Sequence, residues 1–171
     1  NNLATGLFSV TNDSIIYQHC CSAGQAFNNA GTFRKTVATG TTSINNNGFN
    51  NSGTVDIQSG TFAPISGGTS TSVFNATSTS TFVFNSNPYT LGSGATLTGS
   101  GNFQINGSQL IVSSAGVTVD HLTMTGGNLN IIAVSAWLPW TFGALFLSIS
   151  RRSLPWAAVA GASLGVAALA G

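Results

Sequence analysis

The chain has 171 residues, which is enough for one domain with a sizeable core. Only 4% of the residues are charged and the net charge is +1, against about 25% charged residues in an average soluble domain. This balance argues against nucleic acid as a partner, because such binding depends on a strong positive field. The polar surface comes instead from Ser, Thr, Asn and Gly, which suit strands and tight turns better than helices.

Residues 1–26 are predicted to be an irregular N-terminal segment with short strands at 7–10 and 15–17, separated by a Thr-Asn-Asp-Ser turn cluster. The chain begins without a Met and without the basic-then-apolar opening of a signal peptide. We therefore interpret it as a fragment or interior piece of a longer protein.

A His-Cys-Cys trio, His19 to Cys21, lies in this segment. Three residues fall short of the four ligands of a structural zinc site. Neighbouring residues on a strand point to opposite faces, so a disulfide between Cys20 and Cys21 would need an awkward backbone. We interpret the trio as part of a loop, with metal binding as the minor alternative.

A short motif then occurs twice. The sequence Phe-Asn-Asn-x-Gly-Thr begins at Phe27 and again at Phe49, an offset of 22 residues. A fixed period of this length is typical of a solenoid, in which each repeat is one coil and buries its apolar face against its neighbours. The Asn-Asn-x-Gly part predicts a turn, because Asn and Gly tolerate left-handed backbone, and the Thr that follows opens a strand.

The equivalent positions of the two copies are expected to stack. Asn side chains on successive coils can hydrogen-bond one another and the nearby backbone, so we predict an Asn ladder with stacked Phe rings beside it in the core. The repeat positions are Phe27, Asn28, Asn29, Gly31 and Thr32 in the first copy, and Phe49, Asn50, Asn51, Gly53 and Thr54 in the second.

Alternating apolar residues between Gly- or Asn-containing turns continue to residue 131. We predict strands at 32–37, 54–57, from 61, and at 72–75, 81–84, 95–97, 102–105, 109–112, 117–119, 121–125 and 128–131. Alternation places Phe33, Lys35 and Val37 on one face, with the Lys35 stem packed at the edge of a coil and its amine in water. Short, closely spaced strands without hairpin dipeptides favour a parallel β-helix, and a sandwich or jelly roll is the alternative.

The repeated motif and the Gly-rich phrases at 67–70, 91–101 and 122–127 resemble a group of bacterial surface and secreted proteins, the filamentous-haemagglutinin and autotransporter-passenger type. The resemblance covers residues 27–131. It implies an all-β fold, a right-handed parallel β-helix, and a structural or adhesive role outside the cell. Members of the group serve as adhesins, stalks or displayed enzymes, so the likeness is specific for architecture and not for activity.

The composition changes abruptly after the last predicted strand. Residues 131–150 carry no charge, and after Arg151 and Arg152 a second uncharged stretch runs to the C-terminus. About 20 apolar residues suffice to cross a bilayer, and an Arg pair between two such segments fits a cytoplasmic turn. We predict that 132–171 is a hydrophobic, helical tail that anchors the solenoid in a membrane. The alternatives are a cap over the strand edges at the end of the solenoid and a reading-frame error.

The few ionisable residues offer little chemistry. Glycoside hydrolysis needs two carboxylates flanking the bond, and stacked coils could align Asp56 with Asp120, although Asp56 is expected on the solvated face. Asp120 beside His121 would supply an acid next to a base, but no nucleophile accompanies them in a motif. The acids are too few for the calcium cage of a polysaccharide lyase. Arg34-Lys35 could contact an acidic polysaccharide, with a solvated coil edge as the more ordinary interpretation.

The sequence therefore predicts no catalytic, cofactor-binding or metal-binding residues and no cofactor. We expect a non-enzymatic, structural or adhesive segment of an extracellular or cell-surface bacterial protein, tethered to a membrane through 131–171. The expected partner is carbohydrate or another cell surface, and not nucleic acid. The alternative is a fragment of a carbohydrate-active enzyme, lyase-like or glycosidase-like, on the same fold.

Overall fold

The computed structural model describes residues 1–17 and 25–132. Residues 1–130 form one compact unit. Strands β1 to β18 account for almost all the regular structure of the described residues. The predicted tail, 132–171, lies outside them except for Ile132.

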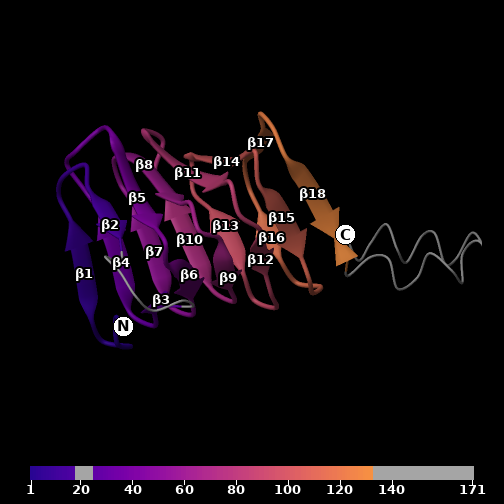
Figure 1. Cartoon of the computed structure of the whole chain (residues 1–171), viewed down its shortest axis with the longest axis horizontal. Coiled ribbons are helices and arrows are strands. Elements are labelled where there is room, and N and C mark those ends of the chain that lie inside the picture. Colours follow the sequence, from indigo (N-terminus) through magenta and orange to yellow (C-terminus); the bar gives the residue numbers. More distant parts are fainter. Residues whose placement is uncertain (18–24, 133–171) are drawn as a thin grey trace, which may run out of the picture. The chain divides into compact units, whose positions relative to one another are not determined.

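Each coil of the chain contributes one strand to each of three parallel sheets (Figure 1). The first sheet contains β1 (Leu7–Val10), β4 (Thr32–Lys35), β7 (Thr54–Ile57), β10 (Val73–Ala76), β13 (Thr96–Thr98) and β16 (Thr118–Val119). The second contains β2 (Ile15–Tyr17), β5 (Thr41–Asn45), β8 (Gly60–Pro64), β11 (Ser80–Asn85), β14 (Asn102–Asn106) and β17 (Leu122–Met124). The third contains β3 (Ala26–Asn29), β6 (Gly48–Asn51), β9 (Gly68–Ser70), β12 (Tyr89–Leu91), β15 (Gln109–Val112) and β18 (Asn128–Ile131).

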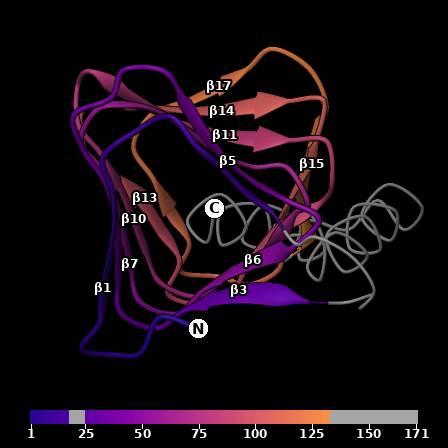
Figure 2. The ribbon, with the colours of Figure 1, turned by 60° about the vertical axis from the view of Figure 1, so that its left-hand side comes forward.

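This arrangement is a parallel β-solenoid of six coils, and Figure 2 shows its three sides. The neighbours within each sheet run parallel and in register, as β4 does with β7 and β11 with β14. The all-β solenoid prediction is confirmed, and the sandwich alternative is wrong because it would place antiparallel strands side by side. The first 17 residues belong to the solenoid, since β1 pairs with β4 and β2 pairs with β5.

The repeated motif marks one coil. Phe27 pairs with Phe49, and the two Asn pairs that follow continue the same register between β3 and β6. The Asn-Asn part therefore lies on strands, and the prediction of a turn there is wrong. The chain turns in the two residues that follow, 30–31 and 52–53, and neither Gly31 nor Gly53 has a positive φ. Glycine is needed at this turn because a Cβ on Gly53 would collide with the carbonyl oxygen of Gly31 on the preceding coil.

The interior is filled with stacked apolar side chains from all three sheets. The fully buried members include Phe33, Val55, Phe74 and Leu97 of the first sheet, Phe62, Phe82 and Phe103 of the second, and Phe49, Tyr89 and Leu110 of the third. Ring centroids approach to 4.6 Å between Phe33 and Phe62 and between Phe74 and Phe82. Each such ring contributes about 1.5–3 kcal/mol by burial, so this aromatic stack dominates the stability of the solenoid.

The first strand after the repeated motif is shorter than predicted. The expected strand at 32–37 ends at Lys35. Val37 has a φ of 71° and is 76% exposed, so it does not share the inner face with Phe33. The Ala38 N–H donates to the Thr36 carbonyl (2.8 Å), which closes a tight turn around Val37 and directs its side chain outward.

Candidate functional site

A buried ladder of amides lies between the third and first sheets. The Asn2 Nδ2 donates to Asn29 Oδ1 (2.7 Å), Asn29 Nδ2 to Asn51 Oδ1 (2.8 Å), and Asn51 Nδ2 to Ser70 Oγ (3.2 Å). Asn29 and Asn51 also donate to the main-chain carbonyls of Thr54 and Val73 on the next coil. The ladder expected from the sequence is therefore present, and its role is structural.

A second, outer ladder follows the solvent side of the third sheet. The Asn28 amide donates to Asn1 Oδ1 (2.9 Å), Asn50 donates to Asn28 Oδ1 (3.0 Å), and the Thr69 hydroxyl donates to Asn50 Oδ1 (3.1 Å). These side chains are uncharged and regularly spaced along the coils. The outer face of this sheet thus presents a row of amide and hydroxyl groups to solvent.

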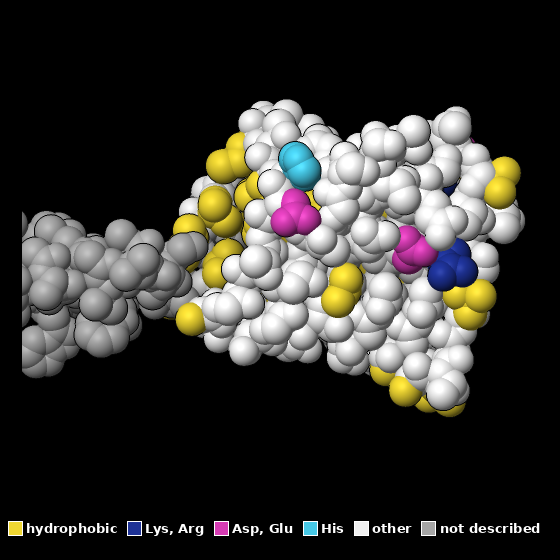
Figure 3. Space-filling view, turned by 180° about the vertical axis from the view of Figure 1, so that it is seen from behind, with side chains coloured by type: hydrophobic (Ala, Val, Ile, Leu, Met, Phe, Trp, Pro, Cys, Tyr) yellow, Lys and Arg dark blue, Asp and Glu magenta, His cyan; other side chains and the backbone are white. Residues whose placement is uncertain are grey.

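A third polar row runs along the outer face of the first sheet. It consists of Arg34, Asp56, Asn75, Thr98 and Asp120. Asp56 accepts from the Arg34 Nε and from the Asn75 Nδ2, both at 3.0 Å. Figure 3 shows an acidic side chain beside a histidine on this face, and a second acidic side chain beside a basic one.

Asp56 and Asp120 share this row, but the fold does not bring them together. Asp56 lies on β7 and Asp120 follows β16, with β10 and β13 between them. Three steps of about 4.8 Å separate the two carboxyl groups by about 14 Å. Paired glycosidase carboxylates are about 5–9.5 Å apart, so this pair does not have that geometry. Asp56 points outward as predicted, and it is bound to Arg34.

Lys35 is fully buried, and the prediction that its amine lies in water is wrong. Its side chain is 0% exposed and its Nζ lies 3.0 Å from Asp13 Oδ1, which is on the preceding coil. The second oxygen of Asp13 accepts from the Gly40 N–H (3.1 Å). Arg34 points to the opposite face, so the two neighbouring bases do not form a surface patch for an acidic polysaccharide.

The hydroxyl of Tyr89 is also buried and serves the fold. It donates to the Phe49 carbonyl (2.9 Å) and lies 3.1 Å from the Thr69 carbonyl. Complete burial raises the pKa of Tyr89 well above its ordinary value of 10.0. Gly68 lies between Phe49 and Tyr89 in the register, and a Cβ there would collide with the Phe49 carbonyl.

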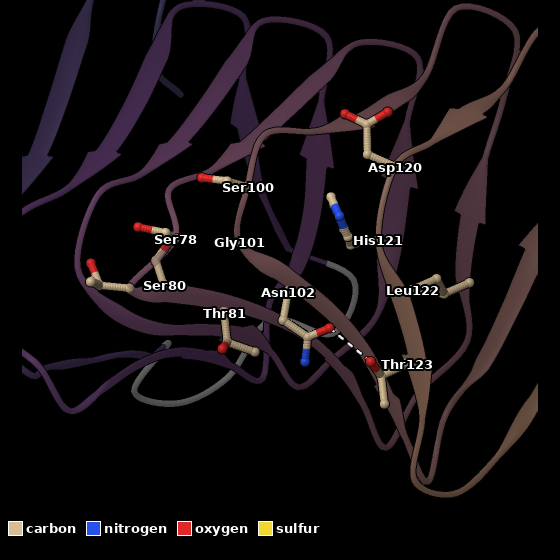
Figure 4. A pocket seen from close by; sticks show the side chains of 11 residues that line it. Ser78, Ser80, Thr81, Ser100, Gly101, Asn102, Asp120, His121, Leu122 and Thr123 are labelled. Atoms are coloured by element: carbon tan, nitrogen blue, oxygen red, sulfur yellow. Dashed lines mark hydrogen bonds between the residues drawn. The ribbon is translucent and has the colours of Figure 1, made fainter.

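An open groove lined mainly by polar residues lies where the first sheet meets the second, over the last three coils (Figure 4). Its volume is about 620 Å³. It is lined by Ser78, Thr79, Ser80, Thr81, Ser100, Gly101, Asn102, Asp120, His121, Leu122 and Thr123. We call this the corner groove, and it is the candidate site.

Asp120 and His121 are both held by Gly99. The Gly99 N–H (3.1 Å) and the Thr98 hydroxyl (2.8 Å) donate to Asp120 Oδ2. The Nδ1 of His121 lies 3.2 Å from the Gly99 carbonyl oxygen. A carbonyl only accepts, so Nδ1 carries the proton in this contact and Nε2 is the acceptor of the neutral ring.

The sequence singled out Asp120 and His121 but not the rest of the groove. Ser and Thr occur throughout the chain, so residue type alone does not set Ser78, Ser100 and Asn102 apart, although Ser78 and Ser100 are separated by the 22-residue offset of the repeated motif. What joins them is the corner, which the chain crosses at 77–79, 99–101 and 120–121. Aligning the segments between successive strands at the 22-residue offset of the repeat would have grouped these positions.

Two further features considered from the sequence are a metal site and a membrane-spanning helix. Within residues 1–17 and 25–132, no group of three or more His, Cys, Asp or Glu side chains is placed to hold a metal ion, and His19, Cys20 and Cys21 lie outside these ranges. A helix with the length and apolar character to span a membrane does not occur among the described residues.

The described part of the chain is thus a parallel β-solenoid with amide- and hydroxyl-bearing outer faces and a polar corner groove. No protein-family model matches this chain, and no curated protein and no solved structure was found to match it.

Proposed function

We propose that this chain is a structural and adhesive segment of an extracellular bacterial surface protein, of the filamentous-haemagglutinin or autotransporter-passenger type, that binds carbohydrate or another cell surface. The observation that carries the proposal is a solenoid whose third sheet carries an outer row of uncharged amides and hydroxyls. Such rows offer repeated donors and acceptors to the hydroxyl groups of a glycan.

The proposal includes a right-handed solenoid. Connections between neighbouring parallel strands are right-handed in about 98% of cases, because a right-twisted strand returns to its sheet most readily in that sense. The chain from β4 to β7, through β5 and β6, connects two neighbouring parallel strands of one sheet, so this preference applies to it. A membrane tether through 131–171 and a cell-surface location complete the proposal.

The positions of the three aspartates support the proposal that the chain is not catalytic. Asp13 binds Lys35, Asp56 binds Arg34 and Asp120 binds the Thr98 hydroxyl. Each described carboxylate lies apart from the others, so none of them forms the acid and base pair of a glycosidase. A carbohydrate-active enzyme would need groups from outside the described residues.

The test combines a binding assay and an activity assay on the same purified chain. We expect retention on at least one immobilised glycan or bacterial or host cell surface, and no depolymerisation of the polysaccharides that are bound. Release of new reducing ends or unsaturated sugars would favour the enzyme alternative. Absence of binding to every glycan and cell surface tested would contradict the adhesive role.

A further inference from the structure

We propose that the corner groove is the subsite for one neutral hexose unit of a glycan, with Asp120 and His121 as its main contacts. This inference rests on the proposed adhesive function and adds to it a site and a class of sugar. It starts from the two side chains that Gly99 holds in place.

Asp120 and His121 each present one acceptor to the groove. Asp120 Oδ2 is occupied by Thr98 and Gly99, while no hydrogen bond to Asp120 Oδ1 occurs among the described residues. His121 uses Nδ1 toward Gly99 and leaves Nε2. Two neighbouring acceptors on a fixed backbone match two neighbouring hydroxyl donors, which is the pattern that a sugar ring offers.

Asn102, on the coil next to His121, supplies a donor. The Thr123 hydroxyl donates to Asn102 Oδ1 (2.9 Å), which fixes the side-chain amide and leaves its NH₂ group without a described partner. Figure 4 shows the Asn102 nitrogen directed away from Thr123. An amide N–H can donate to a ring or hydroxyl oxygen of a sugar.

The hydroxyls of Ser78, Thr81 and Ser100 complete the lining, and none of them has a hydrogen-bond partner among the described residues. Backbone packing holds this wall in place. Gly101 is buried, and a Cβ on it would collide with the Thr77 carbonyl of the preceding coil. The fifth coil therefore packs closely on the fourth and fixes the position of Ser100.

The charge of the groove selects a neutral ligand. Asp120 is its only carboxylate and the lining has neither Lys nor Arg, so an acidic sugar or a phosphate would meet repulsion without a counter-charge. One carboxylate is also too few for a hard cation. The volume of about 620 Å³ is within the range of about 300–1,000 Å³ for ligand sites, and the open rim suits a unit within a longer glycan.

The test uses nuclear magnetic resonance with the purified full chain and the methyl glycosides of glucose, galactose and mannose as probes. We expect saturation transfer to at least one of them and a titratable shift of the His121 ring signals. Because the groove is open to water, which competes for each hydrogen bond, the dissociation constant should be millimolar.

Two variants carry the test, each with a matched control. Ser100→Tyr fills the groove without removing a described hydrogen bond, and Ser93→Tyr places the same ring at an exposed position of the same coil. Asp120→Asn removes the carboxylate, and Asp56→Asn makes the same change in the same row outside the groove. Ser100→Tyr and Asp120→Asn should weaken binding by at least about tenfold, and both controls should bind as the wild-type chain does.

The outcomes separate the groove from the general function. If the chain binds glycans or cells but neither groove variant weakens that binding, the groove assignment is overturned and the adhesive function stands. If no glycoside binds and the chain also fails on every glycan and cell surface, both are overturned. Should Asp120→Asn lower the melting temperature, Ser100→Tyr decides the question alone.

Discussion

The fully buried Asn and Lys side chains of this solenoid find their partners one coil away. The same position recurs about every 4.8 Å along the stack, so a group on one coil faces its equivalent on the next. Asn29 and Asn51 bind each other in this way, and Lys35 binds Asp13 on the coil before it. The pairing matters because an unpaired polar group in the interior costs about 1–3 kcal/mol.

The buried Asn ladder should therefore be more sensitive to truncation than the outer one. Asn29→Ala removes two donated hydrogen bonds and leaves Asn2 Nδ2 and Asn51 Oδ1 without their shared partner. We expect a loss of roughly 2–3 kcal/mol in the free energy of unfolding, measured by urea denaturation. Asn28→Ala in the exposed ladder is the control and should cost less than about 1 kcal/mol. Equal losses would show that burial of the ladder is unimportant.

The Lys35–Asp13 pair predicts an asymmetry between single and double variants. Asp13→Ala leaves a buried ammonium without its partner, and we expect a loss of roughly 2 kcal/mol, moderated because the Asp13 side chain is 44% exposed. Lys35→Met keeps the packed stem and removes the charge, so the double variant should recover most of that loss. Thermal unfolding of the wild-type chain, the two single variants and the double variant gives the coupling free energy between the two residues. Additive losses would contradict the importance of the pair.

The buried Tyr89 hydroxyl predicts an alkaline loss of stability. Its pKa is raised in the folded chain, so the folded state holds the proton more tightly than the unfolded state. The contribution of the Tyr89 proton to the free energy of unfolding is complete below pH 10. It decreases as the pH rises above 10, by up to about 1.4 kcal/mol per pH unit. Tyr89→Phe should be less stable near neutral pH but should lack this decrease. Tyr17→Phe, at an exposed strand position, should retain it.

At the scale of strands, the sequence predicted the strands in which apolar and polar residues alternate strongly, and it missed the strands without that alternation. β1, β7 and β15 have the bounds predicted for them. β9, with the sequence Gly-Thr-Ser, has little intrinsic preference for a strand and is one because β6 and β12 flank it. β3 and β6 were predicted as turns because Asn and Gly favour turns locally. The amide ladder between coils outweighs that preference. The repeated motif predicts the ladder, but it does not show that the ladder holds these Asn residues in strands.

The turn glycines act through contacts between coils, which can be tested on one coil. Gly53→Ala would press a methyl group against the Gly31 carbonyl, and we expect a loss of about 1–3 kcal/mol in the free energy of unfolding. Gly48 lies on the same coil with open space around its Cα and no positive φ, so Gly48→Ala should change stability little. Chemical denaturation of both variants gives the comparison. Equal losses would show that the contact with the Gly31 carbonyl is not the cause.

At the scale of the whole solenoid, stability depends on stacking between neighbouring coils rather than on charge. Within residues 1–17 and 25–132 there are two ion pairs, Arg34–Asp56 and Lys35–Asp13. The buried aromatic stack, in contrast, runs through all three sheets from Phe33 to Phe103. A repeat protein of this kind behaves as a series of coils, each stabilised by its neighbours.

The solenoid should therefore unfold with little dependence on sodium chloride. Screening shortens the Debye length to about 3 Å at 1 M salt. This weakens the Arg34–Asp56 pair, whose Arg34 side chain is partly exposed, more than the contact of the buried Lys35 ammonium with Asp13, and it leaves the aromatic stack largely unaffected. We expect the free energy of unfolding to change by less than about 1 kcal/mol between low salt and 1 M sodium chloride. Sodium sulfate should raise it, because excluded salts strengthen apolar burial. A steep loss in sodium chloride, measured by urea denaturation at each concentration, would mean that charge pairing rather than stacking of coils holds the solenoid together.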